Sequence, residues 1–276
     1  MRVSFASVVV AVASVFVFVT GTACASDAFR DEFTGSSPNT ARWDLVQGPG
    51  GISKAGVPPP MVFNLASGVT VSGGAAHMRL DRQEMRDKTG AVYPFVSARM
   101  QTRHTFLYGQ FEVRAQLPQG RGIWPGLWLR TPFGPPINGE IDLVEGFGSD
   151  PAVLQSTLHT WKNGSETHIY CSRLFVRPQS MFDKFAHSSC KNAERKSSTD
   201  FANGYHVYGL DWRPESVTWL FDGRPYFTMR KEIPSAPMVF VMNILLRKDW
   251  DGGPNDSTKL PQFLDVDYFR YRPLPR

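Results

Sequence analysis

The sequence predicts an all-β domain made of two stacked antiparallel sheets. Short strand-like runs recur along the chain and are separated by turn residues, as is typical of sandwiches and barrels. The 276 residues include 24 Gly, 21 Pro and 13% aromatic residues, a mixture that suits a turn-rich β protein better than a helical bundle. Neither a long helical pattern nor a linker interrupts the runs, so we expect one domain over residues 26–276.

Many of the predicted strands alternate apolar and polar residues. In residues 111–117, for example, Phe111, Val113 and Ala115 face one way while the polar residues between them face the other. The segment Phe221-Asp222-Gly223-Arg224 predicts a hairpin turn, because Asp-Gly is a strong hairpin signal. The predicted strands are residues 77–80, 95–102, 109–117, 126–130, 140–145, 154–160, 205–212, 216–222, 237–246 and 263–271.

Residues 1–25 have the pattern of a secretory signal peptide. Arg2 precedes an apolar run over residues 3–19, and Ala23-Cys24-Ala25 fits a small-x-small cleavage site before Ser26. A transmembrane anchor is the rival interpretation, but the run is at the short end for a membrane span. Lipidation of Cys24 is a second rival, although the large aliphatic residue expected three positions earlier is missing. We therefore expect an extracellular or periplasmic protein with no stable membrane insertion after processing.

The cysteines fit an exported protein. Removing the signal peptide leaves Cys171 and Cys190, and an even count outside the cytosol favours one disulfide. Two unpaired thiols are the alternative, and a zinc site is poorly supported because neither cysteine sits in a CxxC pair. The disulfide would stiffen a polar insertion over residues 162–199 that we otherwise expect to be a long structureless loop.

The charge of the chain is modest and dispersed. The formal net charge is +5, and the Lys and Arg residues are interleaved with acids rather than collected in a stripe. This pattern favours solubility over nucleic-acid binding, and it leaves an anionic polysaccharide open as a partner.

Three carboxyl groups lie within six residues of an apolar, strand-like segment. Glu140, Asp142 and Glu145 would be costly to bury unless they find partners or change their pKa values. Residues 140, 142 and 144 share a face of a regular strand, so bringing Glu145 to that face requires a β-bulge around Leu143-Val144. Such a face can supply the acid and the nucleophile that cleave a glycosidic bond. A solvated strand would not explain the interleaved apolar residues, and calcium prefers flexible loops.

Three motifs follow one another along the chain: Tyr108-Gly-Gln-Phe-Glu-Val-Arg-Ala-Gln-Leu117, Gly122-Ile-Trp-Pro-Gly-Leu-Trp-Leu129 and Gly139-Glu-Ile-Asp-Leu-Val-Glu145. In this order they resemble glycoside hydrolase family 16, the laminarinase, lichenase, agarase and carrageenase relatives. Further matches follow in the same order at residues 156–160, 205–212, 217–223 and 266–271. The resemblance extends from residues 29–33 to the C-terminus. It implies a β-jelly-roll sandwich with a concave, sugar-binding cleft.

The resemblance also implies roles for the three acids. Glu140 would be the nucleophile that forms a covalent glycosyl-enzyme intermediate, and Glu145 the general acid that later activates water. Asp142 between them would keep these two acids in different protonation states. Crowded like charges raise the pKa of one carboxyl group, so that it stays protonated while another is ionised. A retaining mechanism needs carboxyl groups about 5–5.5 Å apart, which one face of a bulged strand can provide.

Aromatic and polar residues near the acids are expected to hold the sugar. A flat indole can stack on the apolar face of a sugar, and the resemblance favours Trp124 for this role. His159 would lie near the leaving group or the acid, whereas Trp212 and Trp219 are expected in the core. The remaining expected sugar contacts are Trp128, Trp161, Asn243 and Arg99.

A structural calcium is a further implication of the resemblance. Family members often carry this ion on the convex side, joining the two chain ends, and Glu32 and Asp267 occupy the matching positions. The alternative is two ordinary surface acids. No cofactor is expected to be required for catalysis.

These features predict a secreted, monomeric, retaining endo-glycoside hydrolase that can also transglycosylate. The bulged ExDxxE pattern resembles the laminarinase and agarase branches, so a β-1,3-glucan or mixed β-1,3/1,4-glucan is the expected substrate. An acidic or sulfated exopolysaccharide or galactan is the alternative substrate, and the insertion at residues 162–199 departs from an ordinary laminarinase. A non-catalytic carbohydrate-binding protein on the same fold is the alternative function.

Overall fold

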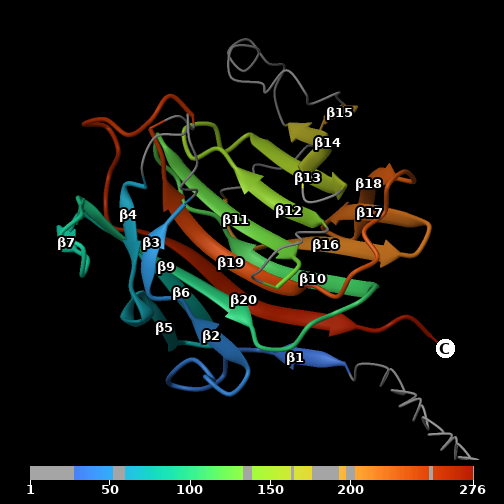
Figure 1. The fold of residues 1–276 in the computed structure, drawn as a ribbon, viewed down its shortest axis with the longest axis horizontal. Helices are drawn as coiled ribbons and strands as arrows, with labels where there is room; N and C mark the ends of the chain where they lie inside the picture. The colour runs from blue at the N-terminus through green and yellow to red at the C-terminus, as the bar shows by residue number, and fades with distance from the viewer. Residues whose placement is uncertain are drawn as a thin grey trace, which may run out of the picture.

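The computed structural model describes residues 28–51, 60–132, 139–162, 165–175, 193–196, 203–248 and 251–275. Two large sheets stack face to face, one of eight strands and one of ten (Figure 1). Most neighbouring strands are antiparallel, as predicted, but β4 (Val62–Asn64) runs parallel to β9 (Phe95–Thr102). Within the described ranges no helix is long and apolar enough to cross a membrane. The predicted all-β jelly-roll sandwich is confirmed.

The eight-stranded sheet is built around the C-terminal strand. Its order is β18 (Arg224–Met229), β17 (Ser216–Phe221), β16 (His206–Arg213), β10 (Gly109–Gln116), β20 (Gln262–Arg272), β6 (Ala75–Leu80) and β5 (Val69–Ser72), with β1 (Phe29–Asp31) also paired to β20. In this way the first and last strands of the described chain are neighbours.

The ten-stranded sheet carries the acidic segment near its middle. Its order is β15 (Ala193–Lys196), β14 (Ser165–Phe175), β13 (Val153–Lys162), β12 (Glu140–Gly146), β11 (Ile123–Arg130), β19 (Val239–Leu246), β9, β4 and β3 (Gly48–Gly50), with β2 (Trp43–Leu45) also paired to β9. The small hairpin β7 (Met85–Arg86) and β8 (Val92–Tyr93) and the 3₁₀ turn η1 (Ala66–Gly68) complete the described elements. All ten predicted strands are present.

The insertion over residues 162–199, expected to be a long structureless loop without the disulfide, contains two strands in its described parts. Strand β14 pairs with β13 from Lys162 opposite Ser165 to Val153 opposite Phe175, and β15 then pairs with β14 in parallel. The backbones of residues 165–175 and 193–196 therefore have partners in the sheet. The pairing adds two strands to the sheet beyond β13, and β13 is the direct neighbour of the acidic strand β12.

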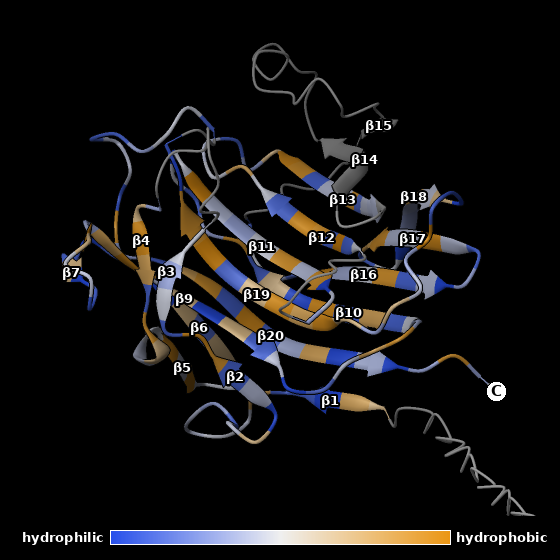
Figure 2. Ribbon diagram, in the orientation of Figure 1, coloured by the Kyte–Doolittle hydropathy of each residue, from blue (hydrophilic) through white to orange (hydrophobic). Residues whose placement is uncertain are grey.

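The core lies between the two sheets and follows the predicted alternation. Apolar and polar bands alternate along the strands of both sheets (Figure 2). Phe111, Val113 and Ala115 of β10 are buried, while Glu112 and Arg114 between them are not. The large interior side chains include Trp43, Trp212 and Trp219, all with no exposed surface. Trp212 and Trp219 are thus core residues, as predicted, and each contributes roughly 1.5–3 kcal/mol or more through burial.

The predicted hairpin at Asp222-Gly223 is confirmed. Both residues have positive φ, 47° and 74°, as a type I′ turn requires. The Asp222 carboxylate also accepts a hydrogen bond of 2.9 Å from the backbone N–H of Val207. The turn fixes the register of β17, which carries Trp219, with β18.

Two predictions fall outside the described residues. The signal peptide over residues 1–25, with Cys24, lies there, and so does Cys190. Cys171 belongs to β14, where its backbone lies opposite Thr157. The signal peptide and the Cys171–Cys190 disulfide stay predictions.

Candidate active site

The predicted bulge is present in β12. On one side Asp142 lies opposite Trp128 and Val144 opposite Leu127, so Leu143 has no partner of its own in β11. On the other side the register with β13 shifts between Asp142 and Glu145. Leu143 and Val144 both point into the core, with 2% and 0% exposure. The extra residue therefore turns Glu145 to the same outer face as Glu140 and Asp142.

Side chains from the surrounding strands stabilise the backbone of the bulge. Ser156 donates a hydrogen bond of 2.7 Å to the carbonyl of Leu143, and Trp219 donates one of 2.8 Å to the carbonyl of Asp142. A bulge removes carbonyls from the regular ladder, and a buried carbonyl without a partner is costly. These two donors satisfy the irregular backbone at the position from which the acids project.

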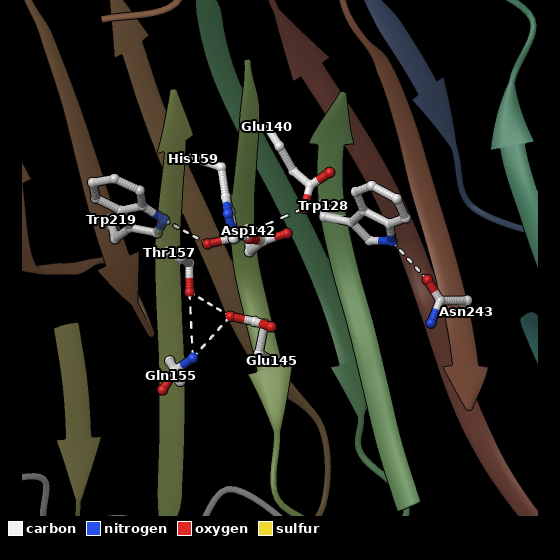
Figure 3. Close-up of polar contacts among 9 residues, drawn as sticks. All are labelled: Trp128, Glu140, Asp142, Glu145, Gln155, Thr157, His159, Trp219 and Asn243. Atoms are coloured by element: carbon white, nitrogen blue, oxygen red, sulfur yellow. Dashed lines mark hydrogen bonds and ion pairs between the residues drawn. The ribbon is translucent and has the colours of Figure 1, made fainter. Parts of the chain in front are cut away.

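Figure 3 shows Asp142 between the other two acids, with His159 beside it. The His159 Nε2 atom lies 3.3 Å from Asp142 Oδ2 and 3.8 Å from Glu140 Oε1. The Glu140 side chain is 25% exposed, whereas that of Asp142 is only 6% exposed. Glu140 can thus meet a ligand on the outer face, while Asp142 forms part of the floor.

The environment of Asp142 favours its protonated form. Burial raises the pKa of the Asp142 carboxyl well above its usual range, and the negative charges of Glu140 and Glu145 raise it further. The contact with His159 opposes this shift without cancelling it. Asp142 can consequently hold a proton at a pH where ordinary aspartates are ionised.

Glu145 is held by two donors from β13. Thr157 Oγ1 and Gln155 Nε2 both donate to Glu145 Oε2, the second at 2.9 Å (Figure 3). The sequence interpretation missed both donors. The sequence spacing could have indicated them, because in a strand the side chains of Gln155 and Thr157 lie on the same face as that of His159. They fix the orientation of the Glu145 carboxyl group.

Trp128, Asn243 and Arg99 lie together on the outer face beside the acids. Trp128 donates a hydrogen bond of 2.6 Å from Nε1 to Asn243 Oδ1 (Figure 3). The guanidinium of Arg99 lies 5.3 Å from the centre of the Trp128 ring. A third neighbour, Arg130, was not predicted, and its guanidinium is 5.7 Å from the same ring. Arg130 is opposite Glu140 in the strand register.

The two other predicted aromatic residues lie on opposite sides of the acids. Trp161 of β13 stacks on His159, with ring centres 5.9 Å apart. Trp124 of β11 is two residues before Gly126 and on the same face of the strand, and Gly126 is opposite Glu145. The guanidinium of Arg247 is 4.7 Å from the Trp124 ring. The outer face thus offers indole surfaces on both sides of the carboxyl groups.

The two acids expected to bind calcium have arginine partners. Both oxygens of Glu32 accept hydrogen bonds from Arg270, at 2.8 and 2.7 Å, and Asp267 accepts one of 2.6 Å from Arg114. An ion held by Glu32 would have to displace Arg270. The observed side chains therefore do not form a ready calcium site, and the calcium site stays a prediction.

The fold and the outer face together define a protein of the β-sandwich class, with three carboxyl groups and several indoles on one sheet. The particular family follows from residues 66–268, which match the model of glycosyl hydrolases family 16. The chain belongs to this family, as the sequence resemblance predicts.

Several known proteins are similar to this chain. A "Beta-glucanase" of Rhodothermus marinus is 34% identical over 204 residues, covering 64% of this chain and 62% of the relative. A "Glucan endo-1,3-beta-glucosidase" of Cryptopygus antarcticus is 32% identical, covering 59% of this chain and 49% of the relative. The chain thus spans about half to two thirds of the length of these relatives. A solved endo-1,3-beta-glucanase (laminarinase) catalytic domain from Thermotoga petrophila RKU-1 has a TM-score of 0.72 and 25% identity, covering 90% of this chain and 97% of that one.

Proposed function

We propose that this chain is a retaining endo-β-glucan hydrolase that works by double displacement. The observation that carries the proposal is the set of three carboxyl groups on one face of β12, each in a different environment. Glu140 is partly exposed, Asp142 is buried beside His159, and Glu145 is held by hydroxyl and amide donors. Groups in different environments can hold different protonation states at one pH, as acid and nucleophile require.

Glu140 is the proposed nucleophile and Glu145 the proposed general acid. A Glu140 carboxylate oxygen bonds to the anomeric carbon while the bond from that carbon to the bridging oxygen breaks. Glu145 gives its proton to this oxygen, which leaves as a sugar hydroxyl. In the second step Glu145 takes a proton from water, whose oxygen bonds to the anomeric carbon and releases Glu140. An acceptor sugar in place of water would give transglycosylation.

Asp142 is proposed to separate the charges of the other two acids. When protonated, it adds no negative charge between Glu140 and Glu145, and it can share its proton with a neighbouring carboxylate. His159 contacts both Asp142 and Glu140, so it is placed to orient them. The mechanism uses carboxyl groups and water, with no step through a cofactor.

The relatives support a β-1,3-glucan or mixed β-1,3/1,4-glucan as the substrate, because one is named a glucan endo-1,3-beta-glucosidase and another, of Rhizobium meliloti, an endo-1,3-1,4-beta-glycanase. Trp124, Trp128 and Trp161 supply stacking surfaces for sugar rings on the same face. The proposal further includes export after cleavage of residues 1–25, a Cys171–Cys190 disulfide and a monomeric state. Mass spectrometry of the secreted, non-reduced protein tests the first two, and sedimentation tests the third.

A polysaccharide panel with the purified mature protein tests the function. Release of reducing ends from β-1,3-linked or mixed-linked glucan, with retention of configuration by product NMR, is the expected result. Inversion would overturn the double displacement. Binding of glucan without any hydrolysis would favour the alternative of a carbohydrate-binding protein.

The predicted calcium needs a separate test. An increase in Tm on adding calcium, lost in Asp267→Asn, would support an ion at Glu32 and Asp267. An unchanged Tm would instead favour Glu32 and Asp267 acting only as partners of Arg270 and Arg114.

A further inference from the structure

Strand β18 of the eight-stranded sheet contains a register shift of its own. Trp219 of β17 lies opposite Phe227 of β18. The next residue of β17, Leu220, lies opposite Pro225, so Tyr226 has no partner of its own in β17. Pro225 lacks a backbone N–H and therefore suits an interruption of the ladder. Tyr226 is buried in the core between the sheets, so the shift brings a tyrosine hydroxyl into the interior.

Ser156 connects this tyrosine to the bulge of the acidic strand. Its hydroxyl oxygen lies 2.5 Å from that of Tyr226 and 2.7 Å from the carbonyl oxygen of Leu143. Leu143 is the residue of β12 that has no partner in β11. Trp219, at the edge of the register shift in β17 and β18, donates to the neighbouring carbonyl of Asp142. The irregular parts of the two sheets are thus joined by buried hydrogen bonds.

The chemistry of the three groups sets the direction of both hydrogen bonds at Ser156. A carbonyl oxygen only accepts, so the single hydroxyl proton of Ser156 goes to Leu143. The Ser156 oxygen then accepts the proton of Tyr226, which requires the neutral phenol. Burial raises the pKa of Tyr226 above its ordinary value and so keeps the phenol neutral. Tyr226 is therefore the first donor of a chain that ends at the bulge.

Ser156 also lies between the two residues that bind Glu145. Gln155 and Thr157 donate to Glu145 Oε2 on the outer face. Ser156 binds the carbonyl of Leu143 on the inner face. Leu143 precedes Glu145 by two residues, so the orientation of its peptide group affects the direction in which the Glu145 side chain leaves the strand. A displaced bulge would therefore misplace the carboxyl group that a sugar meets on the outer face.

From this chain we propose that Tyr226 is a positioning residue for Glu145, acting through Ser156 and the carbonyl of Leu143. The inference rests on the proposed function, because it assigns to the far sheet a part in holding the proposed general acid. Without the phenol, the buried Ser156 oxygen loses its donor. The bond from Ser156 to Leu143 then loses the polarisation that a chain of hydrogen bonds provides.

The test uses the leaving group of the substrate to isolate acid catalysis. A β-1,3-gluco-oligosaccharide would be compared with its dinitrophenyl glycoside, whose leaving group departs without a proton. For both substrates kcat/KM reports the first displacement. Tyr226→Phe should lower kcat/KM about 3- to 10-fold on the unsubstituted oligosaccharide, the size of one hydrogen bond, and less than about twofold on the dinitrophenyl glycoside. A general loss of folded protein would leave the ratio between the two substrates constant.

Further variants trace the route from Tyr226 to the bulge. Ser156→Ala should change the same ratio, and adding Tyr226→Phe to it should cause no further change, because Tyr226 acts through Ser156. Additive changes in the double variant, or a wild-type ratio in Tyr226→Phe, would overturn the proposal. If Ser156→Ala does not fold, the ratio in Tyr226→Phe decides alone.

Tyr93→Phe is the matched control. Tyr93 is 8% exposed, against 7% for Tyr226, and it donates a hydrogen bond of 3.1 Å to Asp87. It belongs to the separate hairpin of β7 and β8. The control loses a comparable hydroxyl without a connection to β12, so its ratio should equal that of the wild type.

Amide NMR separates this inference from the proposed function. In Tyr226→Phe the amide resonances of Val144 and Glu145 should shift, whereas in Tyr93→Phe they should keep their wild-type positions. Such shifts support the coupling to the bulge even if the wild-type protein hydrolyses no glucan. Hydrolysis by the wild type, with unchanged resonances and an unchanged substrate ratio in Tyr226→Phe, supports the enzyme and rejects the positioning role.

Discussion

The indole of Trp219 donates a hydrogen bond of 2.8 Å across the sandwich interior to the backbone carbonyl of Asp142. Trp219 belongs to β17 in the eight-stranded sheet, whereas Asp142 belongs to the other sheet. Trp219 has no exposed surface. One buried bond thus connects the core of the far sheet to the centre of the acidic strand.

This connection predicts a specific effect of Trp219→Phe. The variant leaves the buried carbonyl of Asp142 without its donor, which costs about 1–3 kcal/mol of unfolding free energy. The acidic strand should also become less well ordered, so kcat should fall. Urea unfolding and steady-state kinetics measure the two effects.

Trp212→Phe is the matched control for Trp219→Phe. Trp212 is equally buried and donates from Nε1 to the carbonyl of Pro234, at 3.1 Å. It should lose similar stability without a comparable fall in kcat. Equal kinetic losses in the two variants would show that the Trp219 bond has no special effect on the acids.

Chemical rescue should distinguish the roles of Glu140 and Glu145. Replacing either acid with Ala should lower kcat on natural glucan by at least about 10³-fold. With an aryl β-oligosaccharide and azide, Glu140→Ala should yield the α-glycosyl azide, because azide takes the place of the missing nucleophile. Glu145→Ala should yield the β-glycosyl azide, because azide attacks the covalent intermediate. Product NMR reads the configuration, and the reverse pattern would exchange the two assignments.

The raised pKa of Asp142 predicts how stability depends on pH. Below the unfolded pKa, about 3.9, the carboxyl is protonated in both states and burial carries no ionic penalty. Between that pH and the raised folded pKa, the unfolded chain releases the proton more readily, so wild-type stability falls as pH rises. Burial of the Asp142 carboxyl raises its pKa, so Asp142→Asn removes this term and should have a higher unfolding free energy than the wild type at pH 8. The advantage should vanish near pH 4.

The surface residue Asp87 should have the opposite effect on how stability depends on pH. The hydrogen bond from the Thr89 hydroxyl lowers the pKa of Asp87, so its contribution to stability is present above the unfolded pKa and lost in acid. Asp87→Asn should therefore destabilise at pH 8. Thermal unfolding at several pH values measures both variants, and a pH-independent difference for Asp142→Asn would contradict the burial argument.

Thr157 should act as a positioning residue for Glu145. Thr157→Val keeps the shape of the side chain but removes one of the two donors to Glu145 Oε2. We expect kcat to fall about 5- to 30-fold, corresponding to about 1–2 kcal/mol, with little change in KM. Rescue by Thr157→Ser would show that the hydroxyl is responsible.

The control for Thr157 is Thr218→Val. Thr218 also lies in a strand and bonds to another side chain, the hydroxyl of Thr228, at an exposed position of the other sheet. Its kinetics should match the wild type. An unchanged pH profile and kcat in Thr157→Val would remove the positioning role.

The strands that were predictable from sequence are those with a strong local pattern. Residues 109–117 alternate strictly, and the turn at Asp222-Gly223 carries its own dipeptide signal, so neither depends on distant partners. β1 and β4 were missed because three residues are too few for a pattern. β14 was missed because the segment Ser-Glu-Thr-His at its start is polar at successive positions, and its pairing with β13 is what makes it a strand.

The site likewise contains residues that were predictable from sequence and residues that were not. The bulge and the three acids were predictable because they lie within six consecutive residues. Thr157 and Arg130 reach the acids from neighbouring strands, and the sequence does not state which strands are neighbours. The register of the sheet supplies that information, and it depends on the packing of the whole sandwich.

The bulge gives β12 an unusual tolerance to a change in length. Deleting one residue from a regular strand reverses the faces of every residue beyond the deletion. Deleting Leu143 would instead restore the simple pleat, and the former Glu145 would still face outward with Glu140 and Asp142. The loss would be one buried leucine side chain and a shift of the acid along the strand. At this position of the sandwich, two chain lengths are therefore compatible with one arrangement of inner and outer faces.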